Sequence, residues 1–161
     1  MTYLVEGLLI LLFVSPVNIL LHELSHALAV KFCGGELIKI NLGTGKVLFK
    51  VRKIYVHQWY WNNGEFYFKN LKSESKLSQI IVFLSGPLSN LFFAIMLYLF
   101  KILIGSSELI DIFTTWAFIV FISSMFPSSF GGRNSDGMQI YRILRTGSSV
   151  FITKGKAQNN A

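Results

Sequence analysis

Two histidines and a glutamate lie within five residues of one another in an otherwise apolar stretch, NILLHELSHALAV, residues 18–30. On an α-helix, positions i and i+4 lie above one another on one face, so His22 and His26 can bind one metal ion. Zn²⁺ is the usual ion for nitrogen ligands in an open catalytic site. Glu23 lies one step round the helix from His22, where its carboxylate can take a proton from a water that the metal activates. The spacing therefore predicts hydrolytic zinc chemistry.

The His-Glu-x-x-His pattern, typical of zinc peptidases, fixes only three positions, and its setting makes it more specific. Glu23 is the one formally charged residue between residues 7 and 30. An ionisable side chain at membrane depth costs roughly 3 kcal/mol and marks function by default. The alternative is a hydrogen-bonded polar cluster between helices, or at the end of a span.

The elements that must position these side chains read as transmembrane helices. The chain has 161 residues, of which 52% are hydrophobic and 14% charged, whereas soluble domains carry about a quarter charged residues. Three runs reach the roughly 20 apolar residues that a span needs. We expect an α-helical integral membrane protein with spans near residues 4–31, 77–100 and 110–127. These belong to one membrane-embedded core, residues 1–146, followed by a polar, disordered tail at residues 147–161.

The basic residues predict the orientation. Fourteen of the fifteen Lys and Arg lie either from Lys31 to Lys76 or from Arg133 onwards. By the positive-inside rule the first loop and the C-terminus are cytoplasmic, and the N-terminus and second loop lie outside. We expect a multi-pass protein of a bacterial cell membrane. Because the basic residues lie next to the spans, their expected partner is the anionic lipid bilayer and not nucleic acid.

A catalytic zinc needs a third protein ligand and an open position. Asp136 lies in FPSSFGGRNSDGMQI, where Pro127 and several glycines let the backbone bend back against the protein. The competing interpretation is that Asp136 caps the helix that follows. The candidates on the same side of the membrane as the histidine pair are Cys33, Glu36, His57, Glu65, Glu74 and Asp136.

The second span contains a polar interruption, FLSGPLSN, residues 83–90. Gly86 and Pro87 allow close helix contact and are tolerated where neighbouring groups satisfy the backbone. Alternatively, the Asn90 amide points into the site, where it could hold a substrate carbonyl or stabilise an oxyanion.

The order and spacing of these motifs resemble the site-2 protease family of intramembrane zinc metallopeptidases, over roughly residues 5–145. HELSH matches the family's zinc-binding helix, SGPLSN resembles its Gly-Pro-x-x-Asn motif, and SDG resembles its Asp-Gly motif. The resemblance implies that His22, His26 and Asp136 bind one Zn²⁺ per chain. It also implies that Glu23 is the general base and that Asn90 contacts the substrate or the transition state.

The resemblance implies hydrolysis of a peptide bond in or near a transmembrane segment of a membrane protein or peptide. The chain looks like a minimal member without a PDZ or CBS domain, so a regulatory membrane partner could control access. It departs from the family at Ser135, where Leu is more usual, and at Ser124, where an Asn often begins an Asn-x-x-Pro motif. The alternative is a catalytically inactive relative that acts as a binding, maturation or metal-handling factor; the intact Glu23 favours the enzyme.

Residues 37–69 alternate apolar and polar side chains and predict a small, membrane-associated antiparallel β-sheet in the first loop. We expect Asn62-Asn63-Gly64 to form a hairpin turn between aromatic strands. An exposed strand edge could pair with an unwound substrate segment. The alternative is a membrane-anchored cap, since Trp and Tyr are frequent at the membrane interface.

Overall fold

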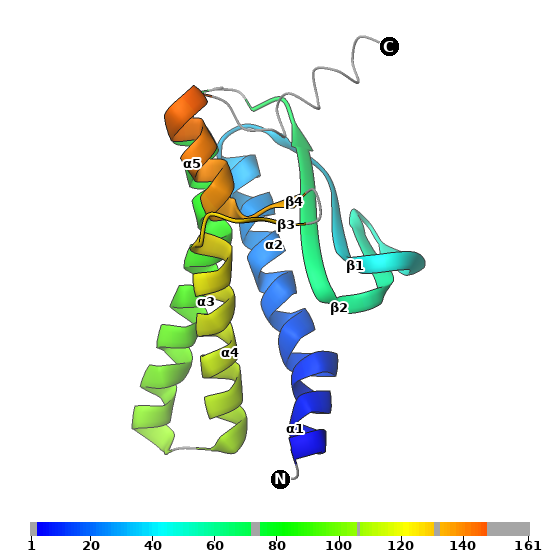
Figure 1. Cartoon of the computed structure of the whole chain (residues 1–161), viewed down its shortest axis with the longest axis vertical. Coiled ribbons are helices and arrows are strands. Elements are labelled where there is room, and N and C mark those ends of the chain that lie inside the picture. The colour runs from blue at the N-terminus through cyan, green and yellow to red at the C-terminus, as the bar shows by residue number, and fades with distance from the viewer. Residues whose placement is uncertain (1–2, 72–74, 106, 131–132, 148–161) are drawn as a thin grey trace.

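A computed structural model describes residues 3–71, 75–105, 107–130 and 133–147, with the side chains of Tyr3 and Phe130 left out. Three long helical segments run side by side in an up-down-up order (Figure 1). Within the described residues they are apolar and long enough to cross a membrane, at Leu4–Phe32, Lys76–Ile104 and Glu108–Met125. The expected three-helix architecture is therefore confirmed, with ends within a few residues of those predicted.

The first segment is continuous but changes its helical form. It consists of α1 (Tyr3–Leu9), a π-helical turn η1 (Ile10–Val14) and α2 (Ser15–Phe32). Pro16 lies in the first turn of α2. Because Pro has no backbone N–H, it cannot donate to the preceding turn, and a wider turn before it is a common adjustment. The turn lies directly before the helix that carries His22, Glu23 and His26.

Caps with a clear sequence signature define the other two long helices. Helix α3 (Lys76–Ile104) begins after Ser75, whose hydroxyl accepts from the Ser78 amide at 3.2 Å, and ends at Gly105. Helix α4 (Glu108–Met125) begins after Ser107, which caps it in the same way. Each serine satisfies an amide that has no partner within its helix.

The first loop forms a long two-stranded antiparallel sheet, β1 (Glu36–Val51) and β2 (Ile54–Lys69). The sheet was predicted, but the predicted turn at Asn62–Gly64 is wrong. These residues lie inside β2, and the chain reverses at Arg52–Lys53, where Arg52 has a φ of 54°. Asn-Gly is a strong hairpin signal. Here β2 continues through it: the pairing register shifts between Leu42 and Thr44, Gly64 pairs with Leu42 of β1, and the Asn62 amide donates to the Thr44 hydroxyl.

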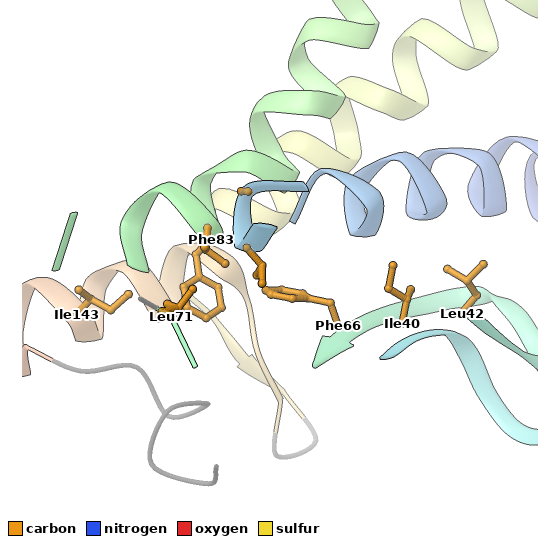
Figure 2. Close-up of a cluster of buried hydrophobic side chains, with 9 residues drawn as sticks. Ile40, Leu42, Phe66, Leu71, Phe83 and Ile143 are labelled. Carbon is orange, nitrogen blue, oxygen red and sulfur yellow. The ribbon is translucent and has the colours of Figure 1, made fainter. Parts of the chain in front are cut away.

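The main hydrophobic cluster lies where the sheet, α2, α3 and the last helix meet (Figure 2). Phe66 of β2 and Phe83 of α3 lie at its centre, with ring centroids 5.8 Å apart. Its buried members are Ala29, Val30, Ile40, Leu42, Phe66, Leu71, Val82, Phe83 and Ile143. This cluster fixes the sheet against one end of the helical bundle, next to the histidine pair.

After α4 the chain forms a short hairpin, β3 (Ser129–Phe130) and β4 (Arg133–Asn134), and then α5 (Asp136–Thr146). Helix α5 packs against the start of α3, and Ile143 on its buried face belongs to the main cluster. A helix therefore follows the Asp-Gly motif, and Asp136 is its first residue. From residue 148 on, the tail for which disorder was expected lies outside the described residues.

Candidate metal and catalytic site

The structure brings together three side chains that are far apart in the sequence. His22 and His26 point from α2 towards Asp136 at the start of α5. His22 Nε2 lies 2.9 Å from Asp136 Oδ2, and His26 Nε2 lies 3.4 Å from Asp136 Oδ1. The two Nε2 atoms are 3.1 Å apart. Among the described residues, these three form the one group of His, Cys, Asp or Glu side chains close enough to bind a metal ion together.

The donor set and its dimensions fit Zn²⁺. Two imidazole nitrogens and one carboxylate oxygen are typical ligands of a catalytic zinc. Ligands that lie about 2.0–2.1 Å from a tetrahedral ion are roughly 3.3 Å from one another. The observed separations of 2.9, 3.1 and 3.4 Å bracket this value. The three donor atoms thus have the mutual spacing of three ligands in a tetrahedral zinc site.

Helix α3 holds the His26 ring by its Nδ1 atom, the nitrogen that does not face Asp136. The Nδ1 of His26 donates to the Val82 carbonyl oxygen at 2.6 Å, which leaves Nε2 facing His22 and Asp136. Phe66 stacks on the other side of the His26 ring, with centroids 4.2 Å apart. A partner on the distal nitrogen sets the tautomer and orientation of a metal-ligating histidine.

Gly86 is the residue that lets α3 come this close to the histidines. A Cβ atom at this position would overlap His26 Nε2 and lie 2.7 Å from His22 Nε2. The sequence interruption at Gly86 thus makes room for the two imidazoles.

Ser135 and Gly137 position the Asp136 carboxylate. The Ser135 hydroxyl accepts from the Met138 amide at 3.1 Å, so Ser135 is the N-cap of α5 and the capping interpretation of Asp136 is wrong. A Cβ on Gly137 would overlap the Met125 carbonyl oxygen, so glycine allows α5 to begin against the end of α4.

The Asp136 carboxylate is held in its charged form. Burial alone would raise its pKa, but the charge of His26 and the hydrogen bonds from both histidines bring the pKa of Asp136 well below its usual range. An ionised carboxylate is the form that a cation needs as ligand.

Glu23 lies beside the three side chains and lines a cavity of about 370 Å³ between α2, α4 and β2. Glu23 is 5% exposed, and its Oε2 has no hydrogen-bond partner in the part of the chain that the structure describes. Strand β2 crosses directly above it at Gly64, where a Cβ atom would lie 2.7 Å from Glu23 Cγ and overlap Oε1. Asn62, Asn63 and Gly64, which were predicted to form a turn, therefore cover Glu23 and the cavity on the β2 side. We call this segment the roof of the site.

An ion pair connects this roof to the hairpin that precedes Asp136. Arg133 Nε lies 2.7 Å from Glu65 Oε1, and the Tyr67 hydroxyl donates to Glu65 Oε2 at 2.7 Å. Burial and then the Glu65 carboxylate raise the pKa of Tyr67 to about 12, against the opposing effect of Arg133. Glu65 was one of the candidate ligands, and the structure pairs it with Arg133 and Tyr67 instead.

Three more candidates for the third ligand contact groups outside the histidine pair. Cys33 is close to the Ser78 carbonyl, Glu36 pairs with Lys69 at 3.3 Å, and His57 Nδ1 donates to the Gly45 carbonyl oxygen. Glu74 lies outside the described residues.

Asn90 is fully buried between helices, and it is not among the residues that line the cavity. Its substrate role stays a prediction.

Two donors in the cavity were missed by the sequence reasoning. Trp116 Nε1 on α4 and Asn63 Nδ2 on β2 line it, are buried, and have no partner within the described structure. No motif marks either residue, because Trp116 lies inside an apolar span and Asn63 lies in the predicted turn.

Two comparisons with known proteins bear on this arrangement. The family model described as Peptidase family M50 matches residues 8–157. The chain is also similar to the "Uncharacterized membrane protein YwmF" of Bacillus subtilis (strain 168). The two are 26% identical over 146 residues, which cover 89% of this chain and 91% of that protein.

Proposed function

Because the chain belongs to peptidase family M50, the site-2 protease family, we propose that it is an intramembrane zinc endopeptidase. The observation that carries the proposal is the convergence of His22, His26 and Asp136 beside Glu23, on the wall of the cavity between α2, α4 and β2. The proposed substrate is a membrane protein or peptide that is cut in or near a transmembrane segment.

The roles of the side chains follow from their positions. His22, His26 and Asp136 would hold the zinc, which when bound supplies a Lewis acid for the scissile carbonyl and lowers the pKa of water. Glu23, whose Oε2 has no other partner, takes the proton of the attacking water and delivers it to the leaving amine. Glu23 is 5% exposed. This burial suits a base that must keep the proton between its removal from water and its delivery to the leaving amine.

The cavity walls suit an extended peptide. Trp116 and Asn63 offer N–H donors without acceptors, and backbone carbonyl oxygens of a substrate are acceptors of the right kind. Strand β2 forms one wall through residues 61–66. A substrate segment must leave its helical form to expose a peptide bond, and pairing with a strand would compensate its backbone groups.

We further propose that the catalytic end of the bundle faces the cytoplasm, in a bacterial cell membrane, with the sheet lying against the bilayer. The support is the distribution of basic residues, which lie on the side of the sheet and α5. A reporter inserted near Asn63 should then read cytoplasmic and one at Ser106 external. Reporters on the same side would contradict three spans.

The test of the proposed function is zinc content and cleavage in the same purified preparation. Wild-type protein should carry about one zinc per chain, and His22→Ala should lose it. Glu23→Gln should keep the zinc and cut a library of fluorogenic single-span peptides about 10²–10⁴-fold more slowly, because an amide cannot accept the proton. Cleavage by Glu23→Gln at the wild-type rate would refute the assigned base. A zinc-loaded wild type without any cleavage would favour the inactive, metal-handling relative.

A further inference from the structure

A second set of polar groups lies buried between α2 and α3, one helical turn away from the three proposed ligands. Asn18 and Asn90 are both 0% exposed. Four of their atoms and those of a neighbour are buried and have no hydrogen-bond partner among the described residues: the Oδ1 of Asn18, both polar side-chain atoms of Asn90, and the Nδ1 of His22. Buried polar atoms of this kind are rare, and each calls for a physical explanation.

The register between the two helices places these groups together. Helices α2 and α3 run antiparallel (Figure 1). His26 bonds to the Val82 carbonyl. One turn further along α3, a Cβ atom on Gly86 would meet the Nε2 atoms of both His26 and His22. Continued by one turn in each helix, this antiparallel register directs Asn18 of α2 towards Asn90 of α3.

The four atoms lie away from solvent. Within the described structure, the Oδ1 of Asn18, both polar side-chain atoms of Asn90 and the Nδ1 of His22 are buried, so bulk solvent does not satisfy them.

The unpartnered atoms of Asn18 and His22 are complementary. With Nε2 of His22 facing the metal position, its Nδ1 carries the proton and is a donor. Helical side chains tilt towards the N-terminus, so the His22 ring leans over the turn that contains Asn18. Asn18 already donates its amide to the Val14 carbonyl at 2.9 Å, which leaves Oδ1 as an acceptor.

We propose that Asn18 and Asn90 hold a buried water that accepts the Nδ1 proton of His22 and fixes this ring for the metal. The inference rests on the proposed function. A buried water typically makes about three hydrogen bonds to groups that are otherwise unsatisfied. Here it accepts from His22 and donates to Asn18, and Asn90 completes its shell from the facing helix. His26 has a carbonyl oxygen for the same purpose, and the water supplies the equivalent partner for His22.

The test is the affinity for Zn²⁺, measured in detergent by competition with a chromophoric chelator. Asn18→Leu keeps the approximate size but removes the acceptor, and it should weaken zinc binding about 10–100-fold. Asn18→Asp retains an acceptor and should stay within about threefold of wild type or bind more tightly. Thermal unfolding of the zinc-free Asn18→Leu protein should stay within about 4 °C of wild type, because leucine fills a similar volume and a lost hydrogen bond costs only about 1 kcal/mol.

Further variants separate positioning from packing. Asn90→Leu should weaken zinc binding, and the double variant should be no weaker than the worse single one, because both residues act through one water. The matched control Val14→Ala should lower the unfolding temperature and leave zinc affinity unchanged. Wild-type zinc affinity in Asn18→Leu would overturn this inference and leave the proposed function intact. Failure of the wild type to bind zinc would overturn the proposed function and this inference with it.

Discussion

Helix α2 has two very different neighbours at the level of His22, Glu23 and His26. On the α3 side, Gly86 lets the helices touch, His26 is bonded to a backbone carbonyl, and no space remains for another side-chain atom. On the side of β2 and α4 lies a cavity of about 370 Å³ with several polar groups that have no partner.

The difference separates two tasks that a metallopeptidase must perform with one helix. The α3 side holds the proposed ligands at fixed spacing, which requires close packing and a partner for the distal nitrogen of each imidazole. The β2 side leaves Glu23 and the cavity donors free for the proposed substrate. Two glycines, Gly86 and Gly64, mark the closest approach on each side. The same substitution at each should slow cleavage, but only the one at Gly86 should weaken zinc binding.

The largest effect is expected on the ligand side. Gly86→Ala places a methyl group where the two imidazole nitrogens meet. Zinc affinity should fall at least about 100-fold, and cleavage should become undetectable. Alanine is the better helix former by about 1 kcal/mol, so the helix itself is not weakened. The measurement is zinc content beside circular dichroism. Gly7→Ala is the matched control, because nothing lies within 4 Å of a Cβ there, and it should behave as wild type.

An intermediate effect is expected on the substrate side. Gly64→Ala places a methyl group on the Glu23 carboxylate, which can swing away because it is the end of a flexible side chain. Cleavage should slow about 100-fold through loss of the positioned base, while zinc content stays that of wild type. Loss of zinc from Gly64→Ala, or full activity, would contradict the division of tasks between the two sides.

The smallest effect is expected at the connection between the roof and the Asp136 hairpin. Glu65→Gln removes the ion pair with Arg133, which is about half exposed. Such pairs contribute up to about 1 kcal/mol, which corresponds to roughly a fivefold slower reaction with zinc retained. Glu36→Gln breaks the exposed pair with Lys69 in the same sheet and should change nothing.

The same substitution has a spectroscopic signature. Without the Glu65 carboxylate, the pKa of Tyr67 should fall from about 12 towards its ordinary value. The difference in phenolate absorbance between the Glu65→Gln and Glu65→Gln/Tyr67→Phe proteins measures it. A slower reaction without this shift would show that Glu65 acts through some other contact.

The sequence predicted those features that depend on local pattern. Apolar length defined the three spans, and i, i+4 spacing placed His22 and His26 on one face. The turn at residues 62–64 was wrong because strand register depends on pairing over a long sheet, which outweighs a local Asn-Gly signal. Asp136 stayed open between capping and metal binding until the structure showed the cap at Ser135. The proposed pairing of Asn18 with Asn90 depends on the register between α2 and α3. Residue types alone do not define this register.

The third proposed ligand lies far along the chain from the other two: Asp136 is 114 positions after His22. During synthesis, the helix with the histidines enters the membrane long before the hairpin with Asp136 leaves the ribosome. The site cannot close until the third span has inserted and α5 has packed onto α3. The order of synthesis thus delays assembly of the proposed metal site until the whole bundle is in place.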